Sequence, residues 1–217
     1  MKLFNALLDL LYPPRCAFCH RLLQSGEEGL CRFCRDRLPY TGPRAEREKL
    51  PHIERCIAPF FYEERVRDSL LRFKFARLTG YAGIYAQFVV KCIDENEISC
   101  DIITWVPVSG RRKRERGYDQ SELLARAVAK QMGLPCLRTL KKIRHTKRQS
   151  RITSDARRKE NVRNAYRCDA PGEIGGKTVL LIDDIVTSGS TLAECARVLK
   201  EAGAASVFAA AVAMRRS

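Results

Sequence analysis

Residues 178–191, TVLLIDDIVTSGST, constrain the fold more than any other stretch of this chain. The run at residues 179–182 is continuously apolar, which is typical of a strand that is buried on both faces. Asp183 and Asp184 follow directly, and we expect the strand to end at these acids. A loop of small residues comes next, and a helical pattern begins at Leu192. The stretch therefore predicts an α/β fold with a buried parallel strand, an acidic tip, a loop and a helix in succession.

The loop after the two aspartates is suited to binding an anion. The first amides of a helix lack partners within the helix and carry partial positive charge, so small residues there can wrap a phosphate. Adjacent carboxylates repel each other unless a sugar hydroxyl or a metal ion lies beside them. The structural alternative is a loop whose last residues cap the helix, with both acids solvated. The candidate phosphate-binding residues are Thr187, Ser188, Gly189, Ser190 and Thr191.

Two Cys-x-x-Cys pairs near the N-terminus predict a structural zinc site. Cys16 and Cys19 are followed, after eleven residues, by Cys31 and Cys34. Each pair can form a tight turn that presents two sulfurs, and a tetrahedral zinc ion joins the two turns. A redox-active pair is the alternative, but that chemistry uses a single pair at the start of a helix in a thioredoxin-like unit. The spacing therefore favours four thiolate ligands to one metal ion.

The zinc segment is too short to bury a sufficient core, so we expect the metal to fold it. The polar, Pro- and Gly-punctuated residues 39–51 are the best candidate for a linker. We place the domain boundary near residue 45, with a zinc-binding lobe at residues 1–44 and a second domain at residues 45–217.

Positive charge is concentrated in one part of the chain. The formal net charge is +15, and residues 107–163 hold 18 Lys and Arg against 5 Asp and Glu. A strand predicted at residues 102–106 leads into residues 107–120, which we expect to form a flexible basic loop. Residues 140–163 are also cationic, which indicates either a lid that closes over a phosphate ligand or a solvated helix or disordered segment. Polyanionic partners are therefore expected.

The remaining pattern predicts a folded, soluble, cytoplasmic protein with 45% hydrophobic residues and no transmembrane segment. In that compartment its ten cysteines serve as metal ligands, core residues or thiols rather than disulfides. A P-loop at residues 172–178 is rejected because its spacing is one residue short and it opens a strand. Periodicity predicts helices at residues 3–11, 66–75, 81–93, 121–132 and 192–201, and strands at residues 57–62 and 206–213.

The order of these motifs resembles that of the ComF family along nearly the full length of the chain. Residues 181–191 resemble the ribose-phosphate motif of type I phosphoribosyltransferases. Two departures from the family pattern are visible, with Asp119 where Asn is usual and Ser188 where a second Thr is common. The other matching segments are the double Cys-x-x-Cys, Val-Pro-Val at 106–108, RGYDQ at 116–120, Arg144-x-Thr-x-x-Gln149 and Arg157-x-x-x-Asn161.

The resemblance implies a type I phosphoribosyltransferase-like open parallel sheet flanked by helices, which binds 5-phosphoribosyl 1-diphosphate (PRPP). Asp183 and Asp184 would hold the ribose hydroxyls, and residues 187–191 would hold the 5-phosphate. The diphosphate implies magnesium as well. Residues that match the family's pyrophosphate loop are Val108, Ser109, Gly110 and Arg111.

ComF proteins are associated with bacterial competence and with the handling of incoming single-stranded DNA. Two functions therefore stay open for this chain. One is a transferase that moves a phosphoribosyl group to a nitrogen nucleophile. The other is a binding module on the same scaffold, which holds single-stranded DNA or a competence helicase.

Overall fold

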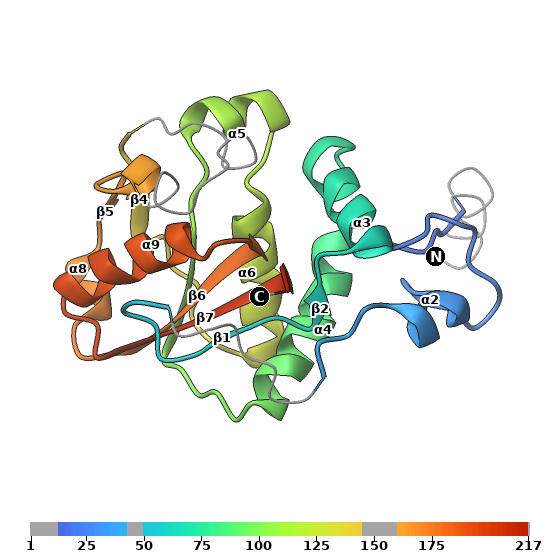
Figure 1. The fold of residues 1–217 in the computed structure, drawn as a ribbon, viewed down its shortest axis with the longest axis horizontal. Helices are drawn as coiled ribbons and strands as arrows, with labels where there is room; N and C mark the ends of the chain where they lie inside the picture. The colour runs from blue at the N-terminus through green and yellow to red at the C-terminus, as the bar shows by residue number, and fades with distance from the viewer. Residues whose placement is uncertain (1–12, 43–49, 145–159, 217) are drawn as a thin grey trace.

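The computed structural model describes residues 13–42, 50–144 and 160–216 (Figure 1). The helix expected at residues 3–11 and residues 145–159 of the expected lid lie outside the described residues. No helix in the described parts is long and apolar enough to cross a membrane.

A five-stranded parallel sheet forms the centre of the molecule, with β6 between β3 and β7. Strand β1 pairs with the first half of β7, and β2 pairs with its end. A separate antiparallel pair joins β4 to β5. The predicted open parallel sheet is therefore confirmed. The strands are β1 (Cys56–Ile57), β2 (Phe60–Phe61), β3 (Ile102–Trp105), β4 (Leu140–Lys142), β5 (Tyr166–Cys168), β6 (Thr178–Val186) and β7 (Ser206–Met214).

Helices cover both faces of this sheet (Figure 1). On one face, Leu180 and Ile182 pack in a cluster with residues of α4 and α6. On the other, Val179 and Leu181 pack against α9. Successive strand side chains point to opposite faces, so a continuously apolar strand buries both. The helices are α2 (Arg32–Arg37), α3 (Glu64–Phe75), α4 (Tyr81–Glu95), α5 (Gly110–Arg116), α6 (Gln120–Met132), α8 (Pro171–Ile174) and α9 (Ser190–Glu201).

The strand expected to end at the two acids runs on to Val186. Asp183 pairs with Ala211 of β7, and this ladder continues past both acids. On the opposite edge, the ladder with β3 ends at Ile182. The prediction was wrong about where the strand ends because apolar residues resume at Ile185, and β7 is long enough to pair with them.

Two further predictions need correction. The expected flexible loop at residues 107–120 contains helix α5, which Ser109 caps at its start and Gly117 ends with φ of 86°. The single strand expected at residues 57–62 is divided into β1 and β2, with Pro59 between them. The helices predicted at residues 66–75, 81–93, 121–132 and 192–201 and the strand predicted at residues 206–213 are all confirmed, with each end within two residues of the predicted one.

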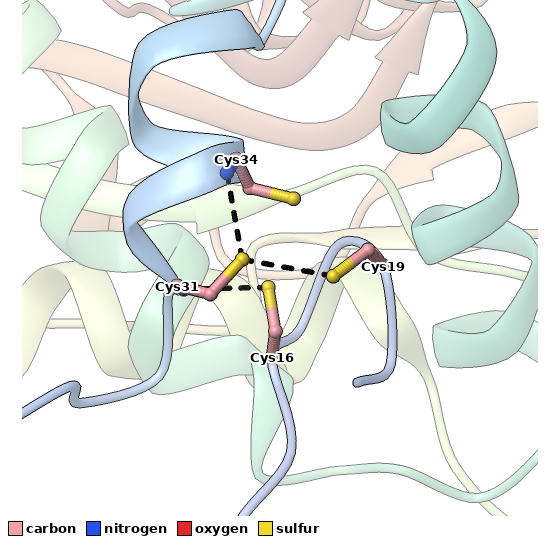
Figure 2. A group of neighbouring side chains, drawn as sticks. All are labelled: Cys16, Cys19, Cys31 and Cys34. Carbon is pink, nitrogen blue, oxygen red and sulfur yellow. Dashed lines mark hydrogen bonds between the residues drawn. The ribbon is translucent and has the colours of Figure 1, made fainter. Parts of the chain in front are cut away.

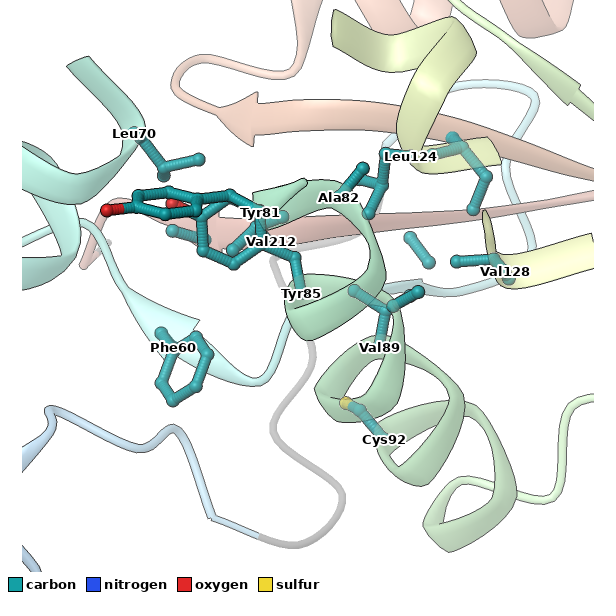
Figure 3. Packing of buried hydrophobic residues seen from close by; sticks show 14 of the residues in the cluster. Phe60, Leu70, Tyr81, Ala82, Tyr85, Val89, Cys92, Leu124, Val128 and Val212 are labelled. Atoms are coloured by element: carbon teal, nitrogen blue, oxygen red, sulfur yellow. The ribbon is translucent and has the colours of Figure 1, made fainter. Parts of the chain in front are cut away.

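The N-terminal lobe packs directly on α3 and α4. The Phe18 ring meets the rings of Phe60, Tyr85 and Phe88 with centroids 5.3, 5.9 and 6.0 Å away. Tyr85 and Phe60 belong to the cluster that continues towards α6 (Figure 3). The lobe therefore shares one apolar core with the sheet domain. The boundary placed near residue 45 lies outside the described residues and stays a prediction.

We expect Phe18→Ala to lower the free energy of unfolding by about 3–5 kcal/mol, because it removes a fully buried ring from the junction of the lobe and the sheet domain. Urea unfolding followed by tyrosine fluorescence measures the change. Leu71→Ala is the control, since Leu71 is 41% exposed on α3 and should cost little. Equal effects of the two substitutions would contradict the shared core.

Candidate functional site

The two aspartates lie where the carboxyl ends of β3 and β6 meet. Val106 donates its backbone N–H to the Ile182 carbonyl at 2.9 Å, and the chain of β3 then leaves the sheet. Asp183 and Asp184 follow on β6 at that point. The crevice beyond the carboxyl ends of such strands is where open α/β sheets bind ligands. The structure thus places the predicted acids at a suitable edge.

Asp183 is half-buried beside the start of α6. Its Oδ1 accepts from the Ser121 hydroxyl at 2.9 Å and from the Asp184 backbone N–H at 2.8 Å. Burial, together with the neighbouring Asp184 carboxylate, raises the pKa of Asp183 to about 7. Ser121 was predicted only as part of a helix, and no spacing in the sequence connects it to an acid 62 residues later.

Asp184 is buried and forms an ion pair with a lysine from α3. The distance between Lys74 Nζ and Asp184 Oδ2 is 2.8 Å, and the two side chains are 18% and 12% exposed. No motif in the sequence singles out Lys74, which lies among several cations in an amphipathic helix. Sequence pattern alone could not distinguish it from solvated neighbours such as Arg67.

The small-residue loop leads from β6 into α9. Gly189 has φ of 73°, and a Cβ at this position would lie 2.4 Å from Leu50 Cδ2, so only glycine fits without displacement. The Ser188 and Ser190 hydroxyls lie 2.8 Å apart. The helix begins at Ser190, two residues before the predicted Leu192, and Gly189 rather than a serine or threonine is its N-cap. The predicted strand, loop and helix N-terminus are all present.

The predicted pyrophosphate-loop residues follow β3 at the same edge of the sheet. Asp119 accepts from the Val108 backbone N–H at 2.9 Å through Oδ2. Its Oδ1 accepts from the backbone N–H groups of Ser121 and Glu122 and caps α6. Burial raises the pKa of the Asp119 carboxyl. Ser109 is buried as the N-cap of α5, whereas Gly110 and Arg111 are exposed.

Lys142 adds another cation near the acids. Its Nζ donates to the Tyr166 hydroxyl at 3.0 Å. Burial and the nearby Arg112 charge lower the pKa of Lys142 to about 8, although the charge of Asp183 acts in the opposite direction. Lys142 had been assigned to the predicted lid, but it lies on β4, which pairs with β5. The beginning of residues 140–163 is therefore a strand of the two-stranded sheet.

The four predicted zinc ligands form one cluster (Figure 2). Their sulfurs all lie within 4.8 Å of one another, and all except Cys19 are buried. Zn–S bonds of about 2.3 Å in a tetrahedron separate the sulfurs by about 3.8 Å. The Cys19 and Cys31 sulfurs are 3.7 Å apart, so the residues fit a four-thiolate zinc site.

The arginine that contacts the cysteine cluster comes from a distant helix and not from the segment around the cysteines. Arg65 of α3 places Nη1 3.8 Å from Cys34 Sγ. Arg21, by contrast, forms an ion pair with Glu27. His20, next to Cys19 in the chain, places Nδ1 3.1 Å from the Tyr81 hydroxyl. The zinc centre therefore contacts α3, the same helix that carries Lys74.

Family models match both parts of the chain. A phosphoribosyl transferase domain model matches residues 119–217, and a double zinc ribbon model matches residues 7–57. The parallel sheet, the acidic end of β6 and the cysteine cluster agree with these two models. Together they define a phosphoribosyltransferase-type protein with an N-terminal zinc-binding lobe.

Two curated relatives cover almost the whole chain, and a third covers two thirds of it. DNA utilization protein YhgH of Salmonella typhimurium is 32% identical over 91% of this chain and 96% of its own length. Competence protein F of Haemophilus influenzae is 25% identical over 87% of this chain and 92% of its own length. Competence protein ComFC of Bacillus subtilis is 25% identical over 67% of this chain and 58% of its own length. The chain belongs to the ComF family.

One solved structure with partial similarity is a B. subtilis glutamine phosphoribosylpyrophosphate amidotransferase in complex with ADP and GMP. The identity is 28% and the TM-score 0.40, and the match covers 63% of this chain and 26% of that chain.

We expect the purified protein to hold one equivalent of zinc and the double variant Cys31→Ser/Cys34→Ser to hold none, because the four thiolates form a single site. Elemental analysis by mass spectrometry measures the content. Cys136→Ser is the control, since Cys136 lies outside the cluster. Retention of zinc in the double variant would show that the metal is bound elsewhere.

We expect Asp119→Asn to destabilise the protein by about 1–3 kcal/mol. A carboxylate accepts through both oxygens, whereas an amide must turn its NH₂ towards either Val108 N–H or the start of α6. Urea unfolding measures the loss, with the exposed Asp94→Asn as control. An unchanged midpoint for Asp119→Asn would refute the two-sided contact.

Proposed function

We propose that this protein binds PRPP as its magnesium complex at the carboxyl end of β6 and transfers the phosphoribosyl group to a nitrogen nucleophile, in a process that serves DNA uptake. The observation that carries the proposal is the pair Asp183 and Asp184 near the end of β6, followed by a loop in which a side chain at Gly189 would displace Leu50. Carboxylates accept from sugar hydroxyls, and a tight loop at a helix N-terminus donates to phosphate.

Each part of the donor has a matching group in the site. The ribose hydroxyls donate to Asp183 and Asp184, and the 5-phosphate accepts from the loop at residues 187–191. The diphosphate lies towards residues 108–111, where Arg111 is exposed at the start of α5. Magnesium would enter with the diphosphate and would offset its charge. These assignments use all of the substrate-binding residues that the sequence predicts, whereas the four cysteines form a separate site.

Transfer breaks the bond between the sugar C1 and a diphosphate oxygen, and the diphosphate leaves with the electron pair. The nitrogen nucleophile donates its lone pair to C1 and releases a proton. Positive charge develops on the sugar as the bond breaks. The carboxylates of Asp183 and Asp184 are placed to stabilise that charge in a site with little water.

Removal of the two carboxylates that are proposed to bind the ribose tests the site. We expect isothermal titration calorimetry with magnesium and PRPP to detect binding to the native protein and none to Asp183→Asn/Asp184→Asn. Asp94→Asn/Glu95→Gln is the matched control, because it also removes two adjacent acids but on α4. Unchanged binding in the first variant would place the sugar elsewhere. Release of diphosphate, assayed with nucleobases and with single-stranded DNA, then tests transfer.

A second candidate function is the binding of single-stranded DNA without transfer. The specific observation that favours it is α5, whose sequence GRRKRER carries five cations and one acid. The relatives are also named for competence and DNA utilization. Cationic side chains bind phosphates in any sequence context and release counterions from the nucleic acid.

Salt dependence measures the number of such contacts. We expect the affinity for a single-stranded oligonucleotide to fall with salt, and the slope of log K against log salt to decrease by about 2 when three α5 cations are neutralised. An affinity that is independent of salt would exclude the DNA function. The test variant is Arg111→Gln/Lys113→Gln/Arg114→Gln, and the control is Arg67→Gln/Lys91→Gln/Lys130→Gln on α3, α4 and α6.

A further inference from the structure

Asp183 and Asp184 place two neighbouring negative charges near the end of β6. Groups outside this strand must donate hydrogen bonds or positive charge to them. Asp184 is 8% exposed, and Asp183 is half-buried next to it. Burial and the neighbouring Asp184 carboxylate both disfavour the charged form of Asp183 and raise its pKa. A buried carboxylate without a partner is strongly destabilising, so the site depends on whichever groups face these two side chains.

The groups that face the acids differ in kind. Asp183 receives a neutral donor, the Ser121 hydroxyl. Asp184 receives a full positive charge from Lys74, at 2.8 Å on Oδ2. Lys74 also lowers the pKa of Asp183, which burial and Asp184 raise. A single lysine from α3 therefore acts on both carboxylates.

The contact also orients Asp184. A carboxylate has two oxygens with about four acceptor positions, and Lys74 contacts Oδ2. With Oδ2 held, the side chain cannot rotate freely, and the remaining acceptor positions of the carboxylate have a fixed direction. An oriented acceptor binds a hydroxyl without first losing rotational freedom.

Helix α3 is itself held at several points. Ser69 Oγ and the Arg72 guanidinium donate to the carbonyl groups of Ala17 and Phe18 in the zinc lobe. Near the end of the helix, the Tyr118 hydroxyl donates to the Phe73 carbonyl. Phe73 precedes Lys74, so the turn that carries the lysine is tied to the segment between α5 and α6.

We infer that Lys74 is a positioning residue of the ribose site, which neutralises and orients Asp184 from a helix held by the zinc lobe. The inference rests on the proposed function in one respect, because it assigns the oriented carboxylate to a sugar hydroxyl. The effect on the two acids is independent of any ligand and can be measured separately.

The first measurement follows the acids without ligand. NMR of the aspartate side-chain carboxyl carbons gives the pKa of Asp183 in native protein, Lys74→Gln and Lys74→Arg. We expect the pKa of Asp183 to rise in Lys74→Gln, since a nearby cation is lost, and to stay close to the native value in Lys74→Arg. An unchanged pKa in Lys74→Gln, or an equal rise in both variants, would overturn the inference.

The second measurement uses magnesium and PRPP in isothermal titration calorimetry. We expect Lys74→Gln to bind about tenfold more weakly and Lys74→Arg to retain most of the affinity. In an Asp184→Asn background the same Lys74→Gln change should have little further effect, because its partner is absent. Lys91→Gln is the control, since Lys91 is 74% exposed and pairs with Glu95 on the surface.

The two measurements separate the possible failures. If the native protein does not bind PRPP, the proposed function is wrong, and the Asp183 titration alone decides the role of Lys74. If the native protein binds PRPP and Lys74→Gln binds it equally well, the positioning role is wrong while the ribose site stands.

Discussion

The site depends on how two neighbouring carboxylates are kept at the end of a buried strand. Strand β6 is covered on both faces and paired on both edges up to Ile182. Beyond that point the chain of β3 leaves the sheet, and of the two acids that follow on β6, Asp183 is half-buried and Asp184 is buried. The Ser121 hydroxyl donates to Asp183, and the Lys74 cation pairs with Asp184, so both carboxylates are stabilised. The remaining parts of the site are arranged around this pair.

Helix α3 links the two chemically distinct centres of the molecule. At its first turn, Arg65 reaches the Cys34 sulfur, and in its last turn Lys74 reaches Asp184. Between them, Leu70 and Phe73 are fully buried in the core that the lobe and the sheet domain share. The zinc lobe thus has a structural role beyond its own folding, because it supports the helix that completes the acid pair.

Local pattern was enough to predict several elements. The apolar run at residues 179–182 identified a strand buried on both faces, and the spacing of the four cysteines identified their cluster. Both signals are short-range, since alternation and turn spacing are properties of a few consecutive residues. The strand end at Asp184 was mispredicted because it is decided by the length of β7, a partner that follows 20 residues later in the chain.

The sequence by itself determined the chemistry of this protein: an acidic strand end, a small-residue loop, a basic segment and four thiolates. Tertiary structure alone decided which side chains from other parts of the chain contact these acids and thiolates. Lys74, Ser121 and Arg65 come from amphipathic helices, where every polar residue looks equally solvated until packing selects the few that face a charge. Asp119 likewise joins Val108 to α6 only once β3 and α6 are side by side. Such pairings connect residues far apart in the chain, and burial gives them their strength.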